Sequence, residues 1–200
     1  MPNSSGGLGK GDFDYKGTVK NVKSLSTIKN PAVYKSVKQA IDRFDSVLGV
    51  RQRQVKIGDL KAGTGGVHIT AGGKSEVVVL SKSVFNGKDS TPQSIAAWAK
   101  SGYDSGHLTK TNKAVSHIVT HELAHATWNA HLTSPNAKAA AKPIEKMYDN
   151  FLKDKKKKGY GKYATTNVSE FWAEVCAKAV HGTADSYTRS AKNIIKKYGL

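Results

Sequence analysis

The chain has 200 residues, which is enough for one domain with a hydrophobic core of its own. Its 32 Lys and Arg residues against 15 Asp and Glu give a formal net charge of +17, which favours polyanions such as DNA, or acidic proteins, as partners. The single cysteine, Cys176, excludes an intramolecular disulfide, and the absence of a signal segment or a long apolar run predicts a soluble protein without membrane contact.

The first 30 residues are rich in Gly, Ser, Asn and Lys and contain few residues suited to a core. This composition predicts a flexible basic arm over residues 1–30, followed by one domain over residues 31–200. We expect a partner or another subunit to hold the arm in place.

A helix is predicted from Pro31 to Gly49, because Pro suits a first helical turn, Gly suits the residue after a helix, and apolar residues recur between them at helical spacing. Three β-like runs follow at residues 53–57, 67–70 and 76–80, separated by Gly-rich turns. They predict a small antiparallel or mixed sheet built from hairpins or a meander. The glycine clusters do not form a phosphate-binding loop, because His68 stands where that motif needs its first Gly.

Further helices are predicted after the sheet, the third of them with Pro143 near its first turns and apolar residues to Leu152. They cover residues 91–100, 112–131, about 143–152, 168–181 and 184–198. Lys153 to Lys158 are predicted to form a solvated basic loop between two of them, with contact to a polyanion as the alternative. The order of one helix, several strands and then many helices predicts an α+β fold.

The sequence His121-Glu122-Leu123-Ala124-His125 is an HExxH motif inside the predicted helix over residues 112–131, which Thr111 or Asn112 can cap. On a helix the two imidazoles lie on one face, so they can bind one Zn²⁺, and Glu122 can act as a general base. The alternative is a helix whose histidines only pack or form hydrogen bonds. The motif therefore predicts metal-assisted hydrolysis.

A catalytic zinc needs a third protein ligand. His131 has the spacing of one known pattern, but Trp128 stands where that pattern has a Gly to turn the chain. The other candidate is Glu170, which lies four residues before Glu174 in an apolar helical stretch, where an unpaired carboxylate is costly.

We predict that Glu170 binds the metal and that Glu174 braces a zinc-binding histidine. An alternative also follows from the sequence: Asn167 caps the helix with Glu170 in its first turn, and Glu174 is solvated.

The HELAH sequence, followed downstream by YATTNVSEFWAE, resembles the peptidase domain of anthrax lethal factor and its relatives. The likeness covers Thr111 to about Ala184. It implies a zincin-like fold, zinc binding by His121, His125 and Glu170, and Glu122 as the base. It also implies a transition-state donor role for Tyr163, with Tyr160 as the donor if the loop register is shifted.

The resemblance implies a zinc-dependent endopeptidase acting on a peptide or protein substrate, which we expect to pair with an edge strand near Val77 to Leu80. Similar small domains occur in phage head and other virion-associated proteins, so we expect a place in the virion or the host cytoplasm, with a virion partner holding the arm. The alternative is a structural or nucleic-acid-proximal virion protein with a vestigial or accessory zinc site. A degraded zincin kept as a binding module is disfavoured, because the ligands and the base are all present.

Overall fold

The sheet is mixed and has four strands in the order β1-β2-β4-β3. The structure is a computed structural model, and it describes residues 19–50, 54–71, 74–129, 135–154, 159–181 and 184–200. The strands are β1 (Lys20–Ser24), β2 (Gln54–Asp59), β3 (Gly66–Ala71) and β4 (Lys74–Ser81). β2 and β4 are parallel, whereas β1 with β2 and β3 with β4 are antiparallel.

The three predicted β runs all form strands, but their arrangement is not a meander. β2 pairs with β4, and the chain between them adds β3 to the outer side of β4. β4 is therefore central, and β3 is an edge strand among the described strands. The predicted peptide-binding edge at Val77 to Leu80 is wrong, because these residues already pair with β2 on one side and β3 on the other.

The N-terminal strand takes up part of the predicted arm. Residues 1–18 lie outside the described residues, but Val19 is buried and β1 pairs with β2. The chain continues through a 3-10 turn, η1 (Leu25–Thr27), and buries Ile28. The expected arm therefore does not extend to residue 30, because a few apolar residues and backbone pairing suffice to dock an otherwise polar segment.

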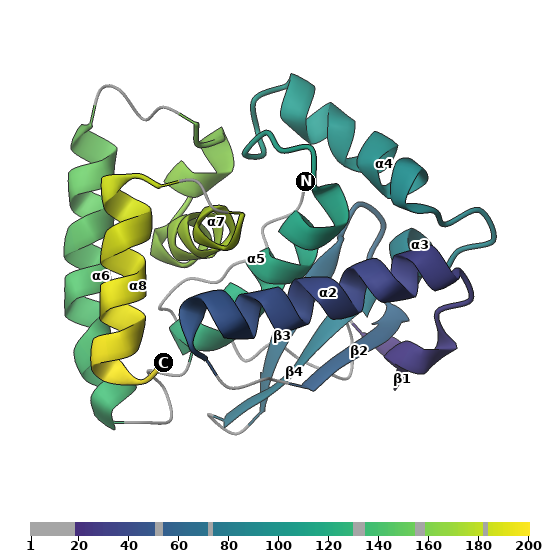
Figure 1. The fold of residues 1–200 in the computed structure, drawn as a ribbon, viewed down its shortest axis with the longest axis horizontal. Coiled ribbons are helices and arrows are strands. Elements are labelled where there is room, and N and C mark those ends of the chain that lie inside the picture. Colours follow the sequence, from purple (N-terminus) through teal and green to yellow (C-terminus); the bar gives the residue numbers. More distant parts are fainter. Residues whose placement is uncertain (1–18, 51–53, 72–73, 130–134, 155–158, 182–183) are drawn as a thin grey trace.

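The helices pack around α5, which lies near the centre of the molecule and against the sheet (Figure 1). They are α2 (Pro31–Leu48), α3 (Lys82–Phe85), α4 (Pro92–Asp104), α5 (Ala114–Asn129), α6 (Pro135–Lys153), α7 (Val168–Val180) and α8 (Ser186–Tyr198). α5 contacts the sheet, α2 and α7, and α6 and α8 pack beyond α7. The α+β class and the small mixed sheet followed by helices are confirmed. Among the described residues, no helix is both long and apolar enough to cross a membrane.

Local signals set most helix ends. Asn30 caps α2 and accepts hydrogen bonds from the first turn, and Gly49 ends it with a φ of 69°. The prediction for α6 is wrong at its start, because the helix begins at Pro135 and carries Pro143 in its interior. The Ala- and Lys-rich turns before Pro143 favour helix strongly enough to offset the one backbone hydrogen bond that this proline removes. Leu152, the last apolar residue of the predicted helix, is 41% exposed.

Candidate metal centre

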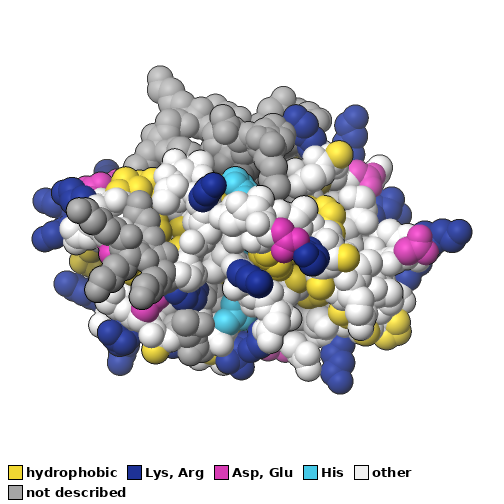
Figure 2. All heavy atoms as spheres, turned by 90° about the horizontal axis from the view of Figure 1, so that it is seen from above, with side chains coloured by type: hydrophobic (Ala, Val, Ile, Leu, Met, Phe, Trp, Pro, Cys, Tyr) yellow, Lys and Arg dark blue, Asp and Glu magenta, His cyan; other side chains and the backbone are white. Residues whose placement is uncertain are grey.

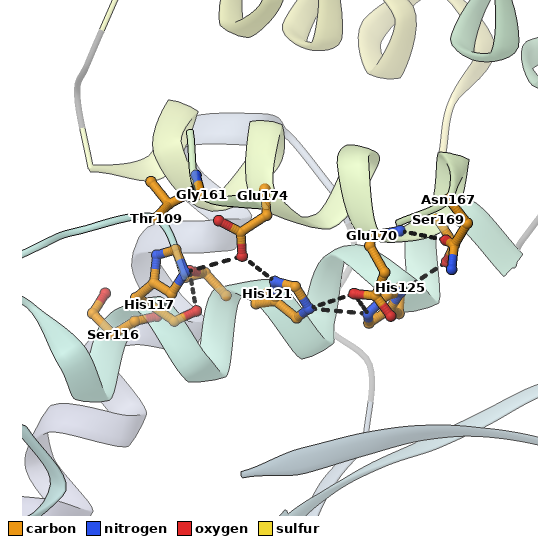
Figure 3. A network of polar contacts seen from close by, with 11 residues as sticks. Thr109, Ser116, His117, His121, His125, Gly161, Asn167, Ser169, Glu170 and Glu174 are labelled. Carbon is orange, nitrogen blue, oxygen red and sulfur yellow. Dashed lines mark hydrogen bonds and ion pairs between the residues drawn. The ribbon is translucent and has the colours of Figure 1, made fainter. Parts of the chain in front are cut away.

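The centre forms where α5 and α7 pack against each other. At the start of α5, Thr111 Oγ1 accepts a hydrogen bond from the Lys113 backbone N–H. At the start of α7, the Asn167 side chain accepts one from the Glu170 N–H at 2.9 Å. Asn167 caps α7, whereas the Thr111 contact ends at Lys113, the residue before α5, and does not reach the first turn of that helix. The HExxH histidines of α5 face the carboxylates of α7 (Figure 3).

Three side-chain atoms meet at one point between the helices. His121 Nε2 lies 3.1 Å from Glu170 Oε2 and 3.1 Å from His125 Nε2, and His125 Nε2 lies 3.3 Å from Glu170 Oε2. Ligands about 2.0–2.1 Å from a tetrahedral zinc are roughly 3.3 Å apart. The separations found here are close to that value, and the three residues could hold a metal ion.

The chemistry of these atoms also fits a cation. His121 Nδ1 lies 2.8 Å from Glu174 Oε1, and because a carboxylate only accepts, this nitrogen carries the proton. In a neutral imidazole Nε2 then has a lone pair, which points at the Glu170 carboxylate. An uncompensated cluster of buried acceptors is costly, so the space between them needs a proton or a metal ion.

The pKa values of His121, Glu170 and Glu174 are shifted in directions that also favour positive charge between the carboxylates. Burial alone would lower the pKa of His121, but the hydrogen bonds and charges of Glu170 and Glu174 raise it well above its usual range. Burial alone would raise the pKa of Glu170, but the positive charges and hydrogen bonds of His125 and His121 lower it. The pKa of Glu174 is likewise lowered, by His117 and His121 against the effect of burial.

Two residues orient the paired histidines from behind. Glu174, which is fully buried, contacts His121 Nδ1, and Ser169 Oγ lies 2.9 Å from His125 Nδ1. Hydrogen bonds of this kind select the tautomer that leaves Nε2 available to a metal. The bracing role of Glu174 was predicted from the sequence, whereas that of Ser169 was not, because its only signal is its place next to Glu170.

Glu174 also serves a third histidine. His117 Nε2 lies 3.2 Å from Glu174 Oε1, and its ring stacks on His181 with centroids 5.8 Å apart. His117, His121 and Glu174 form a second group that could hold a metal ion. Binding there would require His121 to lose the Nδ1 proton that it gives to Glu174, so the group of His121, His125 and Glu170 is the better suited of the two to hold a metal ion.

Glu122 lies between α5 and the edge strand β3. A Cβ atom on Gly66 would stand 2.6 Å from Glu122 Cγ, so the glycine provides the space for this side chain. Burial raises the pKa of Glu122, although the nearby His125 and His121 act against it. A raised pKa suits a group that must accept and then return a proton near neutral pH.

Tyr163 lies over one histidine of the motif, His121. It belongs to a 3-10 turn, η3 (Lys162–Thr165), and its ring stacks on His121 with centroids 5.7 Å apart and planes at 20°. Tyr160, the alternative donor, is engaged elsewhere, because its hydroxyl donates to Asp185 at 3.0 Å. The structure thus brings Tyr163 to the centre and not Tyr160.

The remaining sequence alternatives have clear outcomes. Asn167 does cap α7, but the Glu170 carboxylate turns to the histidines, so the two interpretations are compatible. The alternative that Glu174 is solvated is wrong, since its side chain has no exposed surface. His131 lies outside the described residues.

No family model, curated protein or solved structure matches this chain.

Proposed function

We propose that the protein is a zinc-dependent endopeptidase of the lethal-factor-like kind. The observation that carries the proposal is the contact of His121 Nε2, His125 Nε2 and Glu170 Oε2 within 3.3 Å of one another, beside the glutamate of the same HExxH motif. Two imidazoles and one carboxylate are a ligand set of catalytic zinc, which keeps one further position open.

His121, His125 and Glu170 would hold the zinc. When bound, zinc supplies a Lewis acid that polarises a carbonyl group and makes water a better nucleophile near neutral pH. The histidines contribute through Nε2, since their Nδ1 atoms are directed to Glu174 and Ser169. The Glu170 carboxylate adds the negative charge that balances part of the charge of the ion.

The proton transfers belong to Glu122. Its carboxylate accepts a proton from the attacking water and delivers it to the leaving amine nitrogen as the peptide bond breaks. General acid and base catalysis of this type contributes about 10²–10⁴-fold in rate. The hydroxyl of Tyr163 donates a hydrogen bond to the carbonyl oxygen as that oxygen becomes negative, and losing such a donor costs about 10²–10³-fold.

The substrate would be an extended peptide that pairs with β3. This strand has one unpaired side among the described strands, and its first residue, Gly66, lies against Glu122. A peptide added to this side gains backbone hydrogen bonds and passes beside the proposed base. β3 replaces residues 77–80 as the docking edge.

A second function, contact with nucleic acid in a virion, is favoured by the charge of +17. Figure 2 shows Lys and Arg side chains spread over the viewed face and its edges rather than gathered in one patch. This view shows no clustered basic face of the kind that nucleic-acid-binding domains commonly have, so the net charge alone favours this function. Binding to DNA that weakens steeply as salt rises would support this function, and it is compatible with the peptidase.

Zinc stoichiometry and proteolysis profiling of the wild type and of Glu122→Gln test the peptidase. The substitution keeps size and removes the base, so we expect full zinc content and a loss of cleavage of at least about 10²-fold. Asp149→Asn, an exposed acid-to-amide change on α6, is the matched control. Undiminished cleavage by Glu122→Gln would rule out its role as the base.

A further inference from the structure

The loop between α4 and α5 holds the segment that carries Tyr163. The Lys162 N–H donates to the Gly106 carbonyl at 2.9 Å, and the Tyr163 N–H donates to the His107 carbonyl at 2.8 Å. The Gly161 N–H donates to Thr109 Oγ1 at 3.0 Å, and Thr109 is buried. Residues 106–109 and 161–163 thus form a backbone clasp.

Position 161 needs a glycine because there is no room for a side chain, and not because of its backbone angles. Its φ of −74° and ψ of 164° are open to any residue. A Cβ atom, however, would lie 2.4 Å from the His107 carbonyl oxygen, 2.4 Å from the Leu108 carbonyl carbon and 2.6 Å from the Thr109 nitrogen. All three are backbone atoms, so a side chain at position 161 would push the two segments apart.

The clasp ends at the ring of Tyr163, which lies near two histidine rings. Its centroid is 5.0 Å from that of His107 and 5.7 Å from that of His121. His107 therefore contacts Tyr163 twice, through its carbonyl oxygen and through its ring.

We propose that the clasp sets the position of the Tyr163 hydroxyl over the metal centre, with Gly161, Thr109 and His107 as positioning residues. The inference rests on the proposed function, because that function gives Tyr163 its role as a donor. A displacement of about 1 Å in a reacting group can cost about 10²-fold in rate. The clasp residues touch neither the metal ligands nor Glu122 in any contact described above, so their effect passes through Tyr163.

Steady-state kinetics of Gly161→Ala test the proposal. We expect kcat to fall about 10²-fold with KM and zinc content unchanged. Gly87→Ala is the matched control, since Gly87 lies in the loop between α3 and α4 and its Cβ would stand 2.8 Å from the carbonyl oxygen of Ser83 in α3. It should keep the wild-type kcat. Thr109→Val, which keeps the shape and removes the acceptor of the Gly161 N–H, is a milder second variant expected to lower kcat by about tenfold.

A double-mutant cycle separates positioning from general damage. If the clasp acts through Tyr163, then Gly161→Ala should cause no further loss of kcat in a Tyr163→Phe background. Multiplying losses would overturn the proposal, and so would a wild-type kcat in both Gly161→Ala and Thr109→Val.

An NMR measurement tests the clasp independently of peptidase activity. The Tyr163 ring lies over His121, so the ring signals of His121 in the zinc-loaded protein report where that ring stands. Gly161→Ala should shift these signals, whereas Gly87→Ala should leave them in place. Unshifted His121 signals in Gly161→Ala would overturn the clasp. If the protein cleaves no peptide but the signals shift, the proposed function fails and the clasp stands.

Discussion

The neighbouring helices α7 and α8 have the same length, 13 residues, and opposite surroundings. Every residue of α7 from Ser169 to Val180 is buried, whereas α8 buries only Thr188, Ala191 and Ile195. α8 carries four Lys and Arg residues and no acid, and these side chains are exposed. The charged side chains of α8 therefore need no partner, because water solvates them.

On α7 each charged side chain is held by a partner. Glu170 contacts His121 and His125, Glu174 contacts His121 and His117, and Lys178 Nζ lies 2.9 Å from Asp185. A buried charge without such a partner costs several kcal/mol. Charged residues on a buried helix therefore need partners, and the larger the part of such a pairing that a substitution removes, the larger its expected effect.

The largest effect is expected from Glu170→Ala. The variant loses a direct ligand, so zinc affinity should fall by more than the roughly 10–100-fold that follows from losing a group that only braces a ligand. Competition with a chromophoric chelator measures the affinity, and Glu145→Ala on α6 is the control. Wild-type affinity in Glu170→Ala would place the third ligand elsewhere.

Glu174→Gln should come next. An amide oxygen can accept from His121 Nδ1 but has no charge to offset it, so we expect zinc affinity to fall about 10–100-fold. The unfolding free energy of the zinc-free protein should fall by up to about 3 kcal/mol. The loss is not larger because His121 can release its proton and become neutral. Denaturant titration measures this unfolding free energy. A change below about 0.5 kcal/mol, as at surface positions, would contradict the buried pairing.

A pH dependence of the zinc-free protein follows from the same pairs. The raised pKa of His121 stabilises the fold fully below its ordinary value of 6.5, and this contribution is lost as pH rises through the raised pKa. The lowered pKa values of Glu170 and Glu174 stabilise it above 4.5, and that contribution is lost as pH falls through them. The contribution of these three groups to the midpoint of thermal unfolding in a chelator should therefore be largest between about pH 4.5 and 6.5. His181, whose pKa is lowered by burial to about 4, acts against it as pH falls below 6.5, so the contribution is measured as the difference between the wild type and Glu174→Gln. A difference that does not peak in this window would exclude the pairing.

The smallest effect is expected on α8. Lys192→Gln and Lys196→Gln remove exposed charges, so the unfolding free energy should change by no more than about 0.5 kcal/mol. The same denaturant titration applies. A loss as large as that of Glu174→Gln would remove the contrast between the two helices.

Local patterns were sufficient for most of the helices, although not for the start of α6, and for the main residues of the centre, although not for Ser169. Pro31 and Gly49 mark the ends of α2, and the spacing within HExxH places His121 and His125 on one helix face, because these effects act within a few residues of the chain. Glu170 was predictable because a carboxylate in an apolar helix needs a partner.

Contacts between distant parts of the chain were decided only by the tertiary structure. The sequence did not predict the pairing of β2 with β4, the edge position of β3, the strand β1, or the clasp between residues 106–109 and 161–163. The contact of His117 with Glu174 joins residues 57 positions apart. Pairings at such separations depend on how whole elements pack, and no local spacing encodes which elements become neighbours.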